Sequence, residues 1–160
     1  MKHTISVIVE NKPGVLQRVA GLFSRRGFNI ESLAVGLTEK PEISRITIVV
    51  EGDEQTLEQI TKQLYKIIDV LKVFDLPKDE SIERELVLIK VHANEKSRPE
   101  ITQIVEICQA KIVNVGKEFL VIELSAETDK VENLQKLLDK FGIQELVRTG
   151  KIALQKGEKE

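Results

Sequence analysis

Two hydrophobic patterns alternate along the chain, and their order predicts the fold. In residues 3–10 every second side chain is apolar, as in a half-buried β-strand, whereas in residues 15–25 apolar side chains recur three or four positions apart, as on an amphipathic helix. The first half of the chain continues with further elements: a strand at 28–37, a loop at 38–42, a strand at 46–50, a helix with Asp53 as its N-cap and apolar positions from 57 to 67, and a strand at 70–76. This order is that of a ferredoxin-like unit, in which both helices cover one face of a four-stranded antiparallel sheet.

The second half repeats the order after a charged, non-periodic segment at 77–81. Its predicted elements are a strand at 86–91, a helix opened by a capping box at 97–100 and running through 105, strands at 112–115 and 119–124 around a turn at 116–117, a helix at 131–138 that stops near Gly142, and a strand at 143–154 that Gly150 can interrupt. The sequence therefore predicts an α+β fold of two tandem ferredoxin-like (βαββαβ) domains. The domains are 1–76 and 84–160, with a linker at 77–83 and a solvated, frayed tail at 156–160.

A turn with binding chemistry lies between the first strand and the first helix. Asn11 offers an amide that can donate or accept, Pro13 presets φ, and Gly14 has no Cβ to keep a ligand from the backbone. Because the helical pattern starts directly after Gly14, the first free N–H groups of the helix lie in this turn and favour an anion such as a carboxylate. Asn29, which follows Gly27 and opens the next strand, is expected near the same end of the sheet. The alternative is an ordinary strand–turn–helix connection, since Pro-Gly turns are common.

Composition and charge exclude several classes of protein. Lys+Arg number 24 against 26 for Asp+Glu, and the chain has one Tyr, five Phe and no Trp, so neither a basic surplus nor an aromatic platform favours nucleic acid. The apolar runs at 46–50 and 86–89 are far shorter than the roughly 20 residues that span a bilayer. Strand pattern begins directly after Met1, which leaves no room for a signal peptide. With Cys108 as its single cysteine, the chain is expected to be cytoplasmic.

No catalytic or metal-binding constellation is visible in the sequence. Motifs for a nucleophile elbow, a phosphate loop, a paired-cysteine site or a His-Glu-x-x-His site are all missing. His3 and His92 are isolated near strand ends, where a surface or hydrogen-bonded histidine is the simpler interpretation. Cys108 follows the apolar Val105 on a helical pattern and is interpreted as a small buried side chain. We therefore expect no catalytic residues and no metal site.

The string from Asn11 to Leu16, followed by a short amphipathic helix and a strand, resembles the opening of the ACT domain, a small amino-acid-binding module. Four further segments extend the likeness: 25–36, 44–48, 69–73 and 83–86. Together they resemble the regulatory (small) subunit of acetolactate synthase, also called acetohydroxyacid synthase. The resemblance covers nearly the whole chain and is strongest from residue 4 to about 92.

The resemblance implies a function and a partner. In that family a separate large subunit carries thiamine diphosphate, Mg and FAD and performs the condensation that begins the biosynthesis of branched-chain amino acids, isoleucine among them. The small subunit raises the activity of the large subunit and confers feedback inhibition, usually by valine. This chain is then expected to be non-catalytic, to hold no cofactor, and to form a homodimer through its N-terminal domains with the amino acid in their interface.

The resemblance also assigns roles to residues. Gly14 and Val15 supply backbone N–H groups to the ligand carboxylate, and Asn11 holds the ligand's polar end. Asn29 and Ile30, from the other chain, add an amide and a wall.

Leu16 and Val35 are candidates for the apolar pocket around the isopropyl group, with plain core as an equal alternative. The second copy has no glycine in the matching turn at 93–98, so one site in the N-terminal half is expected.

Two other functions compete with this interpretation. A stand-alone ACT-type amino-acid sensor, acting on another enzyme or regulator, would need a further functional element such as a DNA-binding segment, and none is visible. A catalytic ferredoxin-like enzyme would need a titratable cluster near one sheet end, which the sequence does not show.

Overall fold

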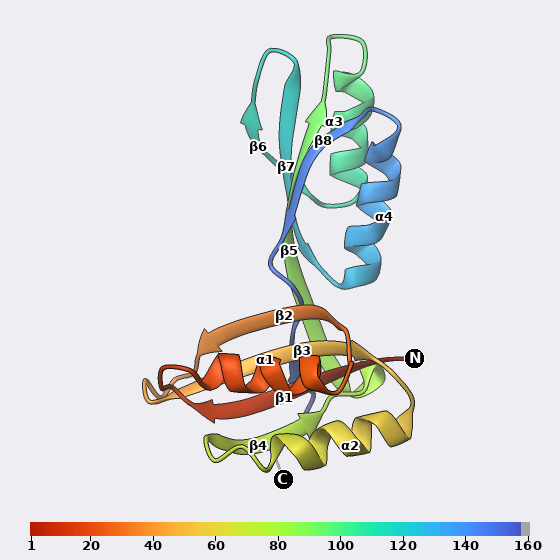
Figure 1. Ribbon diagram of the computed structural model, residues 1–160. Coiled ribbons are helices and arrows are strands. Elements are labelled where there is room, and N and C mark those ends of the chain that lie inside the picture. Colours follow the sequence, from red (N-terminus) through yellow and green to blue (C-terminus); the bar gives the residue numbers. More distant parts are fainter. Residues whose placement is uncertain (158–160) are drawn as a thin grey trace. The chain divides into compact units, whose positions relative to one another are not determined.

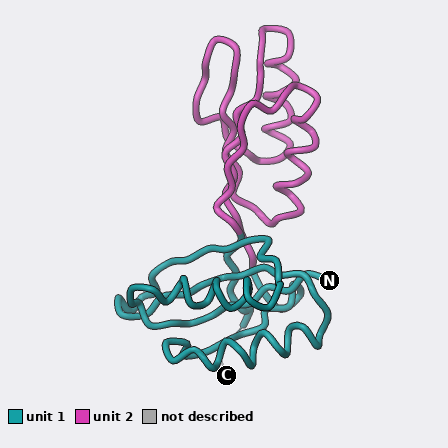
Figure 2. The backbone as a smooth tube through the Cα atoms, viewed as in Figure 1, with its two compact units in different colours: residues 1–82, 151–160 teal, residues 83–150 magenta. Residues whose placement is uncertain are grey.

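The structure is a computed structural model of the chain, and it describes residues 1–157. The chain divides into two compact units, which Figure 2 colours separately. Unit 1 comprises residues 1–82 and the chain from Lys151 onward, and unit 2 comprises residues 83–150. Each unit is an α+β domain built around its own sheet and its own hydrophobic core (Figure 1), as the repeated sequence pattern predicts.

Unit 1 has the predicted βαββαβ order. Its elements are β1 (Lys2–Glu10), α1 (Val15–Arg25), β2 (Ile30–Leu37), β3 (Ile43–Glu51), α2 (Glu54–Leu64) and β4 (Val70–Asp75). The sheet is antiparallel with strand order β2-β3-β1-β4, so β2 and β4 form its edges. Alternate residues of β1 and β3, such as Val7 and Ile48, pack against Phe23 of α1 and Ile60 of α2. Both helices therefore cover one face of the sheet, and the hydrophobic core lies between.

Local sequence explains where the two helices of unit 1 begin. Gly14 has φ 84°, a left-handed conformation that glycine adopts at little cost, and α1 starts at the next residue. Asp53 caps α2 as predicted, since its Oδ1 accepts a hydrogen bond from the Thr56 N–H at 2.7 Å. This hydrogen bond stabilises the carboxylate and lowers the pKa of Asp53.

The opposite face of this sheet, called the helix-free face from here on, carries Ser6, Ser32, Arg45 and Phe74 by strand register. The last strand, β9 (Ile152–Gln155), covers part of this face. β9 pairs with β5 (Ser81–His92), the strand that follows the short helix η1 (Lys78–Glu80) in the chain. The Lys151 N–H donates to Ser32 Oγ at 2.9 Å, and Arg45 Nη1 donates to the Ala153 carbonyl at 3.4 Å.

The end of the chain therefore differs from the sequence-based domain bounds. The pattern places residues 151–157 in the second domain, whereas in the structure these residues group with unit 1. The predicted strand at 143–154 is two strands, broken at Gly150 with φ 87°, and only the first of them, β8 (Ile143–Arg148), lies in unit 2. The reason is hydrogen bonding to unit 1 by the residues after the break. Residues 158–160 of the predicted frayed tail lie outside the described residues.

Unit 2 repeats the fold. Its sheet order is β6-β7-β5-β8, and its other elements are α3 (Arg98–Ile107), β6 (Lys111–Val115), β7 (Phe119–Ala126) and α4 (Thr128–Asp139). The predicted hairpin between β6 and β7 is confirmed by the hydrogen bond from Gly116 N–H to the Phe119 carbonyl at 2.9 Å. The predicted capping box is wrong, because Ser97 has helical backbone angles and its hydroxyl accepts from the Asn94 N–H instead.

Candidate functional site

The turn between β1 and α1 is held by hydrogen bonds to two neighbouring loops. The Glu10 N–H donates to the Asp69 carbonyl at 3.0 Å, and the Asn11 N–H donates to the Glu42 carbonyl at 2.8 Å. The Asn11 side chain donates from Nδ2 to the Pro41 carbonyl at 3.3 Å. This last bond uses the amide nitrogen of Asn11, and Oδ1 is the acceptor atom of the same amide. Asn11 is exposed, as a binding residue must be.

Gly14 and Val15 present backbone rather than side chain at this turn. An added Cβ at Gly14 would lie 3.2 Å from Arg18 Nη1, and its positive φ already disfavours other residues. The Val15 side chain is buried in the core, so only its backbone faces the turn. The Val15 N–H donates to the Lys12 carbonyl at 3.4 Å, a long bond that a stronger acceptor can replace. The partial positive charge of the helix N-terminus lies here as well.

Arg18 is a site residue that the sequence interpretation missed. Its Nη2 donates to Oδ2 of Asp69, whose side chain is only 7% exposed, while its Nη1 lies beside Gly14. The buried carboxylate thus holds the guanidinium over the turn. The available signal was the position of Arg18, four residues after Gly14 and hence one helical turn away on the same side. Its partner Asp69 was not foreseeable from local sequence.

A second cation lies in the same turn. Lys12 Nζ is 2.7 Å from Glu10 Oε2, and this hydrogen bond raises the pKa of Lys12. Each cation of the turn is thus paired with one carboxylate of the protein. The side chains of Lys12 and Glu10 are 62% and 38% exposed, so of the two cations only Arg18 is held by a buried carboxylate.

Leu16 and Val35 are solvent-exposed. Their exposed fractions are 42% and 49%, so the alternative that they are plain core is wrong. Val35 pairs with Ile46 and so lies on the helix-covered face, but β2 is an edge strand, and the helices leave this edge uncovered. Leu33 and Leu37 lie on the same side of β2 as Val35 and are exposed too. Both side chains are therefore accessible, Leu16 directly after Val15 on α1 and Val35 level with Val7 of β1.

Asn29 and Ile30 lie at the other end of the sheet, and the prediction that they share the end of the Asn11 turn is wrong within one chain. Glu10 pairs with Ile43 at one end of β3, whereas Ile30 pairs with Val50 near the other end. The 11 residues of α1 separate the two places by about 16 Å at the helical rise of 1.5 Å per residue. The chain direction explains the separation. A helix that packs antiparallel to the preceding strand ends near the beginning of that strand, so residues 29 and 30 lie near the start of β1 and not near its end.

The remaining candidates have structural explanations. His3 is buried, and its Nε2 lies 3.1 Å from the Gly52 carbonyl, so it is hydrogen-bonded. Cys108 is half-buried, and burial raises the pKa of its thiol. Within residues 1–157 no cluster of His, Cys, Asp and Glu is arranged to hold a metal ion. In the same residues every helix is too short or too polar to cross a bilayer.

Comparison with known proteins assigns the family. Residues 5–72 match the family described as "AHAS small subunit-like ACT domain", and residues 84–157 match the family described as "Small subunit of acetolactate synthase". The chain belongs to the acetolactate synthase small-subunit family. A probable acetolactate synthase small subunit of Archaeoglobus fulgidus is 54% identical over 100% of both chains, and the acetolactate synthase small subunit of Mycobacterium leprae is 50% identical over 97% of this chain and 92% of that protein.

A solved structure extends the assignment to the fold. The crystal structure of the acetolactate synthase small subunit from Thermotoga maritima superposes with a TM-score of 0.91 at 43% sequence identity and covers 99% of each chain. The predicted ACT domain and the predicted family are thereby confirmed. A small regulatory subunit of acetolactate synthase implies a separate catalytic large subunit as its partner.

Proposed function

We propose that unit 1 binds valine at the Gly14 turn and that this binding regulates the acetolactate synthase large subunit, which the chain also activates. The observation that carries the proposal is the convergence at one turn of a glycine-opened helix start, the Arg18 guanidinium and the oriented Asn11 amide. An α-amino acid presents a carboxylate and an ammonium close together, and this turn offers donors for the first and an acceptor for the second.

Each part of the ligand has a candidate contact. The carboxylate accepts from the N–H groups of Gly14 and Val15 at the positive end of α1. The ammonium donates to Asn11 Oδ1, which the Nδ2 bond to Pro41 leaves available. The isopropyl group packs on Leu16 and Val35. A single methylene contributes only about 1–3 kcal/mol of discrimination in such a pocket, so leucine and isoleucine are expected to bind more weakly rather than not at all.

A symmetric pair of chains completes this site. β2 is an edge strand that exposes unpaired backbone groups together with Leu33, Val35 and Leu37, and such an edge is satisfied by a second strand. A two-fold axis makes two copies of β2 run antiparallel, so the Ile30 end of one copy lies beside the Leu37 end of the other. Asn29 and Ile30 of the second copy then approach the turn that they cannot reach within their own chain.

The regulatory effect follows from binding between two copies. A ligand can shift the equilibrium between an active and an inhibited state of the assembly only by the difference in its affinity for the two states, which is typically about 1–3 kcal/mol. In this proposal the chain itself is non-catalytic, and thiamine diphosphate, Mg and FAD belong to the large subunit.

Valine inhibition of the assembled enzyme tests the site. The large subunit is co-purified with wild-type chain or with Gly14→Asp, and activity is titrated with valine. The added carboxylate occupies the anion position and strains a residue with φ 84°, so at least about tenfold more valine is expected to be needed for half inhibition.

The matched control is Gly142→Asp, which places the same side chain at another left-handed glycine, in unit 2, where an added Cβ has room. The enzyme assembled with Gly142→Asp is expected to be inhibited by the same valine concentrations as the wild-type assembly. A Gly14→Asp enzyme as valine-sensitive as wild type would show that the site assignment is wrong, and failure of the wild-type chain to co-purify with the large subunit would refute the partner.

A further inference from the structure

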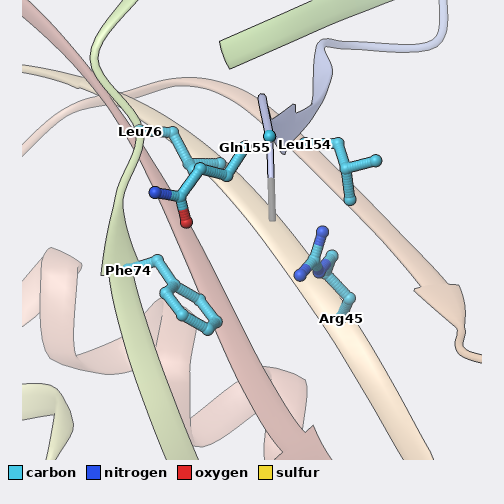
Figure 3. Close-up of a pocket in the computed structure, with 6 residues that line it drawn as sticks. Arg45, Phe74, Leu76, Leu154 and Gln155 are labelled. Carbon is cyan, nitrogen blue, oxygen red and sulfur yellow. The ribbon is translucent and has the colours of Figure 1, made fainter. Parts of the chain in front are cut away.

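A small cavity lies on the helix-free face of unit 1 and has no lining residue from the Gly14 turn. Its volume is about 120 Å³, and its lining residues are Arg45, Phe74, Leu76, Leu154, Gln155 and Gly157. Figure 3 shows the side chains of Arg45, Phe74 and Gln155 around a common space, with Arg45 coming from β3, Phe74 from β4 and Gln155 from β9. The strand that overlays the sheet thus forms one wall of the cavity.

Most of this lining is apolar. Leu76 is buried and Phe74 is half-buried, and Leu154 adds an aliphatic wall from β9. Ser6, the register partner of Phe74 on β1, is fully buried and is not a lining residue, so its hydroxyl adds no polar group to the cavity wall. A ligand body that rests here therefore needs to be largely hydrocarbon.

Arg45 supplies a strong polar group at the edge of the apolar walls. Its Nη1 donates to the Ala153 carbonyl at 3.4 Å, which is long for a hydrogen bond. Within residues 1–157 no carboxylate forms an ion pair with this guanidinium. A guanidinium presents five N–H donors in a planar fork that matches a carboxylate, so most of its donor capacity is available to a ligand.

Lys72 adds positive charge on the same face. Its Nζ lies 4.5 Å from the centroid of the Phe74 ring, as a cation–π contact. The lining residues include no Asp or Glu. A cationic group on a ligand would therefore find no opposite charge among the lining residues, whereas an anionic group finds Arg45, with Lys72 beside the Phe74 ring as a further positive charge outside the lining.

We propose that this cavity binds a small aliphatic monocarboxylate without an ammonium group. The carboxylate pairs with the Arg45 guanidinium, and the hydrocarbon part packs on Phe74, Leu76 and Leu154. The cavity volume of about 120 Å³ suits a ligand no larger than benzene, because an apolar cavity of roughly 150 Å³ holds benzene. The proposal is independent of valine binding at the Gly14 turn, because it uses the opposite face of the sheet and a different charge pattern.

Binding here connects β9 to the sheet. Leu154 and Gln155 contact the ligand from β9, and Arg45 contacts it from β3, so an occupied cavity stabilises β9 on the helix-free face. Occupancy is therefore expected to slow hydrogen exchange of the β9 amides.

The test is an NMR titration of the full-length, ¹⁵N-labelled chain with isobutyrate and with its neutral isostere isobutyramide. Saturable shifts are expected at the amides of Phe74, Leu76, Leu154 and Gln155 with isobutyrate. Isobutyramide is expected to bind at least about tenfold more weakly, the loss that removal of a charge-assisted hydrogen bond produces. Equal binding of the two compounds, or no saturation with isobutyrate, would overturn the proposal.

Two variants and two controls locate the site. Arg45→Gln removes the charge, and Leu154→Phe fills the cavity from an exposed position while keeping Arg45, so each is expected to weaken isobutyrate binding at least about tenfold. Arg26→Gln removes an exposed arginine of the same unit and is expected to bind like wild type.

Gly14→Asp serves as the second control and is expected to keep isobutyrate binding while losing valine. Isobutyrate shifts confined to residues 11–16, or binding unchanged by Leu154→Phe, would refute the cavity as the site without bearing on valine regulation.

Discussion

The two units share one fold but begin their first helices differently, and the difference is why the proposed site lies in unit 1. In unit 1, Gly14 opens α1, Asn11 keeps an acceptor unused, and Arg18 lies over the turn. In unit 2 the turn before α3 uses its own polar groups: Asn94 Oδ1 accepts from the N–H groups of Lys96 and Ser97 at 3.0 and 2.9 Å.

The arginines show the same contrast. Arg98, in the first turn of α3, donates from Nη2 to the backbone carbonyls of Gly116 and Lys117 and so closes the β6–β7 turn. Arg18 is instead held by the side chain of Asp69, beside an open backbone. Units of equivalent topology thus differ in whether the polar groups of this turn are already used in hydrogen bonds within the fold, and the proposed site is in the unit where some of them are not.

Replacing each of the two arginines by glutamine is expected to give the largest difference between the units, in both stability and valine binding. Arg18→Gln leaves the buried carboxylate of Asp69 without its cation and is expected to lower the free energy of unfolding by about 1–3 kcal/mol. It should also weaken valine binding. Arg98→Gln loses hydrogen bonds to two carbonyls, with an expected cost of about 1 kcal/mol and no change in valine binding. Urea unfolding and calorimetric valine titration measure both quantities, and equal valine affinities in the two variants would remove Arg18 from the site.

The two asparagines are expected to separate stability from binding. Asn94→Ala removes an acceptor for two backbone N–H groups and should cost about 1–2 kcal/mol of unfolding free energy without affecting valine. Asn11→Ala removes one long, exposed hydrogen bond to Pro41, so its stability cost should be about 0.5 kcal/mol, but valine affinity should fall. The same unfolding and calorimetric measurements apply. A pattern in which Asn94 rather than Asn11 affected valine would place the ligand in unit 2.

The smallest expected effect concerns the second helix of each unit. Asp53 caps α2, whereas Glu127 precedes α4 without a capping hydrogen bond from its side chain. Since the native pKa of Asp53 is lowered, its contribution to stability is present above the unfolded pKa of about 3.9 and is lost as pH falls through the native value. Asp53→Ala should therefore lower Tm at pH 7 and converge with wild type in acid. Glu127→Ala loses only a 3.9 Å ion pair between two exposed side chains, that of Glu127 and that of Arg84, and should change Tm little at any of these pH values. Thermal unfolding between pH 7 and pH 3 checks this, and a pH-independent Asp53→Ala difference would contradict the capping role.

The sequence by itself determined what depends on near neighbours. Alternating and helical periodicity predicted both βαββαβ repeats, Asp53 was recognisable as a cap, and Gly14 as the residue before α1, because each signal lies within a few residues of the element it forms. The capping-box prediction at Ser97 was nevertheless wrong, because the Ser97 hydroxyl accepts a hydrogen bond from the Asn94 N–H.

Tertiary structure decided what depends on distant partners. It placed Asn29 at the far end of α1, left Leu16 exposed on α1 and Val35 exposed on the edge strand β2, and paired Arg18 with Asp69, 51 residues further along the chain. It also directed residues 151–157 to the helix-free face, where Leu154 and Gln155 line a cavity with Arg45. Periodicity indicates to which side of its own helix or strand a side chain points. The edge strands of the sheet and the partners of charged side chains are determined only when elements far apart in the chain pack together.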